Sequence, residues 1–84
     1  MRTTTRTRFV EILSGQLGLK VEEIRDHESF AHMYADEQDL EEIVYETERE
    51  FNVDIGAREI GPESTVESVV RLLELKQDPR ATSV

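Results

Sequence analysis

Two histidines and two acidic residues gather in one short stretch and offer atoms that a metal ion can bind. They are Asp26, His27, Glu28 and His32. Imidazole nitrogens and carboxylate oxygens are ordinary ligands for zinc and similar cations. Their spacing, however, matches no known metal-binding motif, and histidines in a polar loop are typically solvated. We therefore expect no metal site in this stretch.

Paired carboxylates and serine hydroxyls are the other side chains that could carry chemistry. Glu41 with Glu42, and Glu48 with Glu50, are close enough in sequence to suggest a catalytic acid pair. In so acidic a segment they are more typical of a solvated helix face. The serines are Ser14, Ser29, Ser64, Ser68 and Ser83. Because no nucleophile, base and orienting group converge, we expect neither an enzyme nor a bound cofactor.

The most acidic stretch runs from Ala35 to Phe51 and predicts one helix. Asp36 is a suitable N-cap, and Asp39 stands where a capping-box partner would be. Apolar positions recur at helical spacing along one side. They are Leu40, Ile43, Val44, Thr47 and Phe51. The hydroxyl of Thr47 can bond back to the carbonyl of Ile43; the alternative is that Thr is simply tolerated on this face. The rest of the helix surface is strongly anionic.

A first helix is predicted from about Thr5 to Leu17, ending at Gly18. Its apolar stripe is Phe9, Ile12, Leu13 and Leu17. The following segment, 19–35, is expected to be an ordered loop with one helical turn near Val21 to Ile24. Its apolar residues should pin it onto the core. They are Leu19, Val21, Ile24 and Phe30.

Two further helices are predicted in the second half of the chain. A short third helix is expected from Ala57 to Ile60. A capping box formed by Ser64 and Glu67 should open a fourth helix, and Asp78–Pro79 should end it. Its apolar stripe is Val66, Val69, Val70 and Leu73.

Length and charge restrict what the molecule can be. Its 84 residues suit one small domain, with disordered tails expected at 1–5 and 79–84. The absence of cysteine excludes disulfides and thiolate chemistry. A net charge of −9 argues against nucleic acid or an anionic membrane as partner and favours a protein with a basic surface. The same charge could equally serve only to keep a small protein soluble. No apolar run of membrane length is present, so we expect a cytoplasmic protein.

The order and spacing of these segments, over residues 8–76, resemble the acyl carrier protein family. The run from Gln16 to Ile24, followed by Ser29-Phe30, is similar to bacterial members, as is the acidic helix after it. The resemblance implies an all-α fold: a four-helix bundle with three main helices and one short helix.

One departure from the family's sequence pattern determines which function we predict. The family's second helix opens with Asp-Ser-Leu, and the Ser carries a phosphopantetheine arm. Those three positions fall on Asp36, Glu37 and Gln38. A carboxylate at Glu37 cannot form the phosphodiester. We therefore expect an acyl-carrier-protein-like binding or adaptor protein that lacks this site. The alternative is a genuine carrier in fatty-acid, polyketide or related thioester metabolism with an atypical attachment site.

Partner contacts are expected on the outward side of the second helix. Tyr45 lies off the apolar stripe, at a position where the family contacts its partner enzymes, and it could equally be a lone exposed or half-buried aromatic. The full predicted docking set is Asp36, Gln38, Glu41, Tyr45 and Glu48. The resemblance implies an acyl-chain or polyketide enzyme as the kind of partner.

Overall fold

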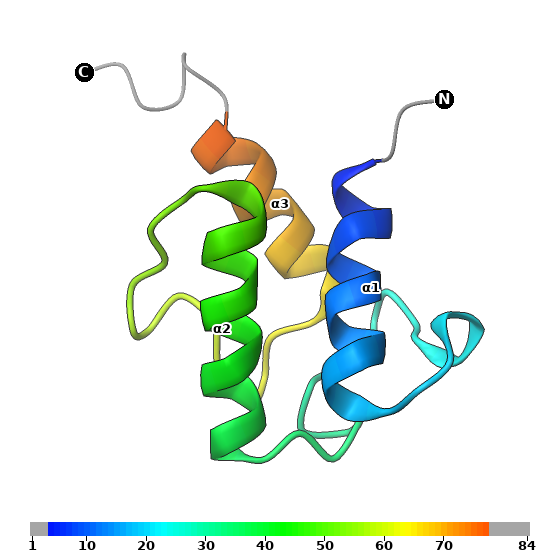
Figure 1. Ribbon diagram of the computed structural model, residues 1–84. Helices are drawn as coiled ribbons and strands as arrows, with labels where there is room; N and C mark the ends of the chain where they lie inside the picture. Colours follow the sequence, from blue (N-terminus) through cyan, green and yellow to red (C-terminus); the bar gives the residue numbers. More distant parts are fainter. Residues whose placement is uncertain (1–3, 78–84) are drawn as a thin grey trace.

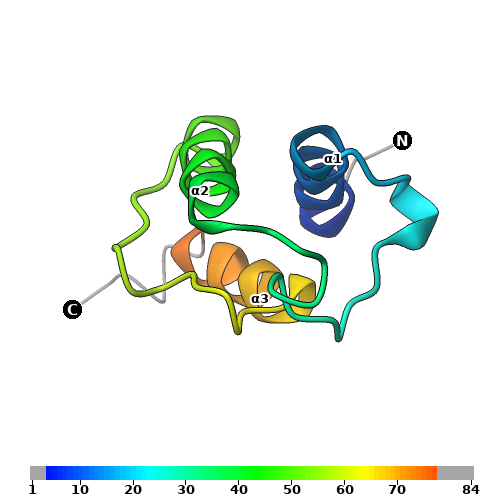
Figure 2. The ribbon, with the colours of Figure 1, turned by 90° about the horizontal axis from the view of Figure 1, so that it is seen from below.

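The computed structural model describes residues 4–77 and contains three α-helices and one 3₁₀ turn in that range. They are α1 (Thr5–Leu17), η1 (Val21–Glu23), α2 (Glu37–Phe51) and α3 (Val66–Gln77). Helices α1 and α2 lie side by side, and α3 packs across them (Figure 1). Seen from below, the η1 loop and the segment after α2 lie on opposite flanks of the bundle (Figure 2). The expectation of a small helical bundle is confirmed.

The ends of the first two helices follow the predicted capping chemistry. Gly18 adopts a left-handed φ of 69° and donates its N–H to the carbonyl of Ser14. The carboxylates of Asp36 and Asp39 each accept the other's backbone N–H, at 2.8 and 3.0 Å, as a complete capping box. Thr4 caps α1 by accepting the N–H of Thr7, so the predicted N-terminal tail is too long.

Apolar side chains from all three helices meet in one core. Its completely buried members include Phe9, Leu13, Phe30, Ile43, Val66 and Leu73. The loop before α2 is pinned by Ile24 and Phe30, as expected, whereas Val21 is 44% exposed and takes no part. Backbone bonds from Phe30 to Ser64 and from Ala31 to Pro62 tie this loop to the one before α3.

Two local predictions are wrong. Residues 57–60 form a turn and not a third helix, because Glu59 closes back onto Gly56 and Gly61-Pro62 follows at once. The cap of α3 lies one residue later than predicted. Thr65 and Ser68 exchange bonds there, while the Ser64 hydroxyl accepts from Gly61.

The predicted end of the last helix at Asp78–Pro79, and the tail beyond it, lie outside the described residues. No helix within residues 4–77 has the length and apolar character needed to cross a membrane.

Candidate functional site

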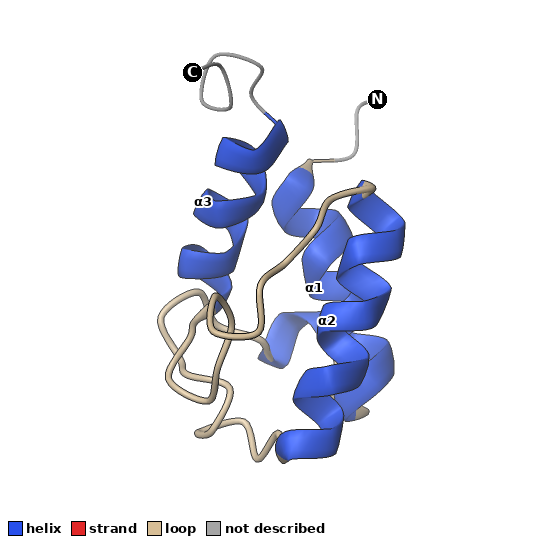
Figure 3. Ribbon diagram, turned by 90° about the vertical axis from the view of Figure 1, so that its left-hand side faces the viewer, coloured by secondary structure: helices blue, strands red, loops and turns tan. Residues whose placement is uncertain are grey.

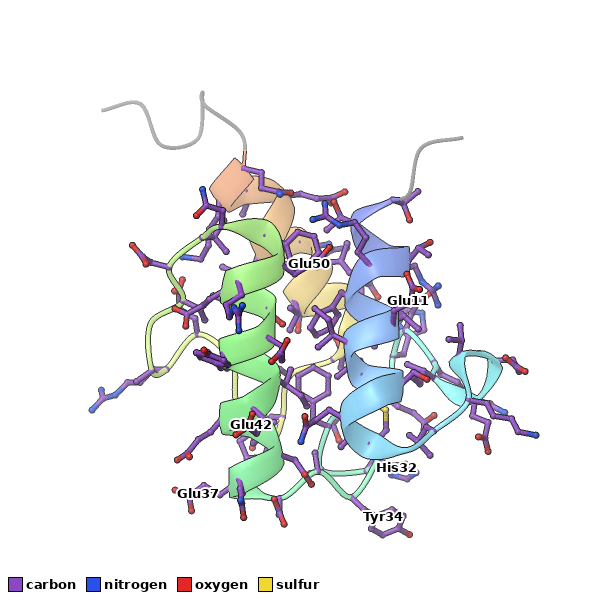
Figure 4. All side chains as sticks on the ribbon, viewed as in Figure 1. Glu11, His32, Tyr34, Glu37, Glu42 and Glu50 are labelled. Atoms are coloured by element: carbon purple, nitrogen blue, oxygen red, sulfur yellow. The ribbon has the colours of Figure 1, made fainter. Side chains whose placement is uncertain are left out.

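The N-terminal mouth of α2 presents carboxylates and no hydroxyl. Its first residues are Glu37, Gln38 and Asp39. Glu37 is exposed and lies at the lower end of the helix, well away from the core (Figure 4). Asp36 is exposed too, although one of its carboxylate oxygens is engaged by the capping box. The helix dipole favours this negative charge, which makes the mouth a stable anionic end.

The serine hydroxyls of the described chain are already engaged in local bonds. Ser14 donates to the carbonyl of Leu19 at 2.6 Å, and Ser29 accepts the N–H of His32. Ser64 accepts the N–H of Gly61 in the turn before α3, and Ser68 exchanges bonds with Thr65 at the start of α3. These four serines therefore hold turns and helix ends together, which gives each a structural role.

An apolar cleft of about 660 Å³ opens beside the acidic helix. Its lining residues come from α2 and from the loop that leads from α2 to α3. Figure 3 shows the course of that loop between the two helices. Its wall on the helix includes Leu40 and Val44, with Glu37 and Glu41 exposed beside them. The loop contributes Gly56, Ala57, Ile60, Gly61 and Pro62. The cleft therefore combines an apolar interior with an acidic border. Helical periodicity in the sequence does not reveal it, because the loop supplies half of its wall.

The loop wall of the cleft is held by one carboxylate. Glu59 accepts the N–H of Gly56 at 2.7 Å and pairs with the Lys76 ammonium of α3 at 2.9 Å. The Gly56 bond, with help from Lys76, lowers the pKa of Glu59 below its ordinary value of 4.5. Ile60 is 6% exposed and anchors the same turn in the core. This turn is consequently fixed in place although it is not helical.

The predicted docking residues of α2 separate into three groups. Glu41 borders the cleft, while Gln38 and Tyr45 are exposed on the helix surface. Tyr45 is 52% exposed, and the guanidinium of Arg49 lies 5.6 Å from its ring centre. Glu48 differs from all of these, because its carboxylate is half-buried and accepts the N–H of Ile55 at 2.9 Å. Glu48 thus has a structural task in closing the loop after α2.

Most carboxylates of α2 have no ion-pair partner in the part of the chain that the structure describes. Within residues 4–77, Glu50 is the only acid of this helix in an ion pair, to Arg8 at 2.9 Å. The same guanidinium donates to the Glu50 carbonyl and lies 4.3 Å above the Phe51 ring, which joins α1 to α2. The remaining carboxylates face solvent or cap backbone groups. A cationic partner would meet them without displacing an internal ion pair.

Tyr34 is a feature that sequence reasoning missed. It has a φ of 64°, and its side chain is 92% exposed at the lower end of the molecule, near His32 in the loop before α2 (Figure 4). A bulky residue in the left-handed region is strained, typically by about 1–2 kcal/mol. The one available signal was the resemblance itself, because acyl carrier proteins usually have Leu-Gly at the end of this loop, where the chain has Met33-Tyr34.

The histidines and the core threonine complete the set of predicted chemical groups. His27 pairs with Glu67 at 2.8 Å and His32 with Glu28 at 3.4 Å, both on the surface. No cluster of metal-ligating side chains occurs in residues 4–77. Thr47 is completely buried, and its hydroxyl has no hydrogen-bond partner within residues 4–77, so the bond to the Ile43 carbonyl that its position allows is not formed.

Comparisons with protein-family models and with curated proteins give no match to this sequence. What the chain does must therefore be inferred from its own side chains.

Proposed function

We propose that this chain is an acyl-carrier-protein-like adaptor of the cytoplasm that has no phosphopantetheine site and works by binding. It docks a protein with a basic surface through the acidic α2, and an acyl-chain or polyketide enzyme is the partner class that the resemblance implies. The chain is neither an enzyme nor a nucleic-acid or membrane binder.

The observation that carries the proposal is the composition of the α2 mouth. The helix is well capped and exposes Glu37 and Gln38 where a carrier needs Ser and Leu. Uncompensated carboxylates along the same helix supply long-range attraction to a cationic surface, mainly through the association rate. A modified hydroxyl is not required for docking of this kind.

The rival function, a genuine carrier with an atypical attachment residue, requires an accessible hydroxyl. Between Ser29 and Thr47 the hydroxyls belong to Tyr34 and Tyr45, and Tyr34 is the more exposed of the two, at 92% against 52%, two residues before the N-cap Asp36. A phenol at this place gives the rival its best attachment candidate. Any test must therefore be able to detect modification of Tyr34 as well as of serine.

An intact-mass measurement separates the two functions. The chain is incubated with coenzyme A and a pantetheinyl transferase, and we expect no gain in mass. A known carrier protein in the same reaction shows that the transferase is active. A gain in mass, mapped by peptide analysis to Tyr34 or to any serine, would falsify the non-carrier proposal.

A gain-of-function variant tests the α2 mouth directly. The double substitution Glu37→Ser and Gln38→Leu restores the family's residues on the existing helix and should accept some of the prosthetic group. Gln38→Leu alone should accept none and serves as the matched control. Replacing Glu37 removes one favourable charge–dipole interaction of about 0.3–1 kcal/mol, so the variant should stay folded.

A further inference from the structure

The cleft beside α2 is apolar inside and acidic at its border. Leu40 and Val44 are half-buried along the helix, and Ile60 is nearly buried in the opposite loop. Glu37 and Glu41 stand exposed on the helix side of the same cleft. In the isolated chain water fills this recess, so its apolar surface stays exposed to solvent and is available to a partner.

The spacing of the two border acids matches the geometry of a second helix. Glu37 and Glu41 are four residues apart, which places them one turn apart on the same side of α2. Cations one turn apart on a partner helix lying along α2 have the same separation, roughly 6 Å at 1.5 Å per residue. An apolar side chain three positions after the first of those cations lies beside them on the same side of the partner helix, where it can face the cleft.

We propose that the cleft receives an apolar side chain from a basic amphipathic helix of the partner, whose Lys or Arg residues pair with Glu37 and Glu41. This inference rests on the proposed docking function and specifies the chemistry of the docked segment. Charge complementarity favours such a helix over a free fatty acid, because the border acids repel a carboxylate and attract an ammonium or guanidinium. Two residues of the apolar wall, Leu40 and Val44, then become contact residues for the partner.

Two synthetic peptides test the proposal without knowledge of the partner. The first is an alanine-based helix with two Lys residues four positions apart and one Leu three positions after the first Lys, on the same side of the helix. The second has Gln in place of that Leu and the same charge. Because both peptides offer the same cations, a difference in their affinity measures the apolar contact alone. Fluorescence anisotropy at low ionic strength should show the Leu peptide binding roughly tenfold more tightly.

Variants of the chain assign that difference to the cleft. Ala57→Trp fills the cleft from its loop side and should bring the two peptides to equal affinity. Val21→Trp adds the same ring at an exposed site on the opposite flank and should leave the tenfold preference intact. Glu41→Lys should weaken both peptides alike, whereas the same charge reversal at Glu11 on α1 should weaken them much less.

Amide chemical shifts of the unaltered chain give a second measurement that does not depend on any variant folding. The Leu peptide should shift Gly56, Ala57 and Gly61, and the Gln peptide should not. Equal affinity for both peptides, still sensitive to Glu41→Lys, would overturn the cleft proposal and leave acidic docking intact. Failure of both peptides to bind would overturn the cleft proposal and the proposed acidic docking together. Stronger shifts of the same amides by dodecanoate than by the Leu peptide would identify a fatty-acid site and overturn the proposal.

Discussion

Replacing Thr47 with Val should stabilise the protein. The Thr47 hydroxyl is completely buried and has no hydrogen-bond partner among the described residues. An unpaired buried polar group is unfavourable by about 1–3 kcal/mol relative to its hydrated state, and Val removes the polar atom while keeping the branched shape. Helix propensity changes little between the two residues. We expect a gain of about 1–2 kcal/mol in the free energy of unfolding, or roughly 5–15 °C in melting temperature for a domain of this size.

Urea unfolding followed by circular dichroism at the helical band measures this gain. Thr7→Val is the matched control, because it makes the same chemical change on an exposed side of α1. There the hydroxyl bonds to that of Thr4 at 2.8 Å, and its removal should give no stabilisation. A Thr47→Val variant with unchanged or lower stability would refute the reasoning, since it would mean that the hydroxyl finds a partner in the folded protein.

Three further predictions concern the charge, the strained loop and the cleft wall. Raising the salt concentration from about 20 to 150 mM should raise the melting temperature, because screening relieves repulsion along α2; a flat or falling value contradicts this. Tyr34→Gly should raise the melting temperature by several degrees, because glycine adopts the left-handed φ of 64° without steric strain, and a decrease would show that the tyrosine stabilises the fold. Glu59→Gln should lower stability at neutral pH. The pKa of Glu59 is lowered on folding, so its contribution is present above the ordinary glutamate pKa and disappears as the pH falls through the lowered value. The melting temperatures of the unaltered chain and of Glu59→Gln should therefore converge at acid pH. A difference in melting temperature that persists there would mean that Glu59 stabilises the fold through packing and not through its charge.

Helical periodicity predicted the parts of the fold that depend on burial and capping. The positions of Phe9, Ile43, Val66 and Leu73 in the core follow from their spacing, because a helix with one apolar side has only one way to face a neighbour. The capping box of Asp36 and Asp39 is a local interaction, so it could also be predicted from the residues themselves. These features need no knowledge of the tertiary structure.

The predictions that failed depend on contacts between segments distant in sequence or on competing local bonds. The turn at 57–60 is fixed because Glu59 accepts the N–H of Gly56 and pairs with Lys76. The amino-acid sequence alone does not reveal the pairing with Lys76, which lies 17 positions away. The sequence predicts Ser64 as the cap of α3, but Ser64 accepts the N–H of Gly61 in the preceding turn, and Thr65 accepts the N–H of Ser68 in its place. Thr47 remained unpaired although its helix offers a carbonyl one turn earlier.

Contacts between distant segments also determine which acid of α2 is suitable for a mutational test of docking. Composition treats Glu41 and Glu48 as equivalent acids on one anionic helix, yet Glu41 borders the cleft and Glu48 accepts the N–H of Ile55. Charge reversal at Glu48 would break an internal bond and loosen the loop after α2, so weaker binding by that variant could not be assigned to docking. Glu41 has no such internal partner among the described residues, and its charge can be reversed with the loop intact. A binding defect at Glu41 together with normal unfolding is therefore the result that identifies a docking contact on α2.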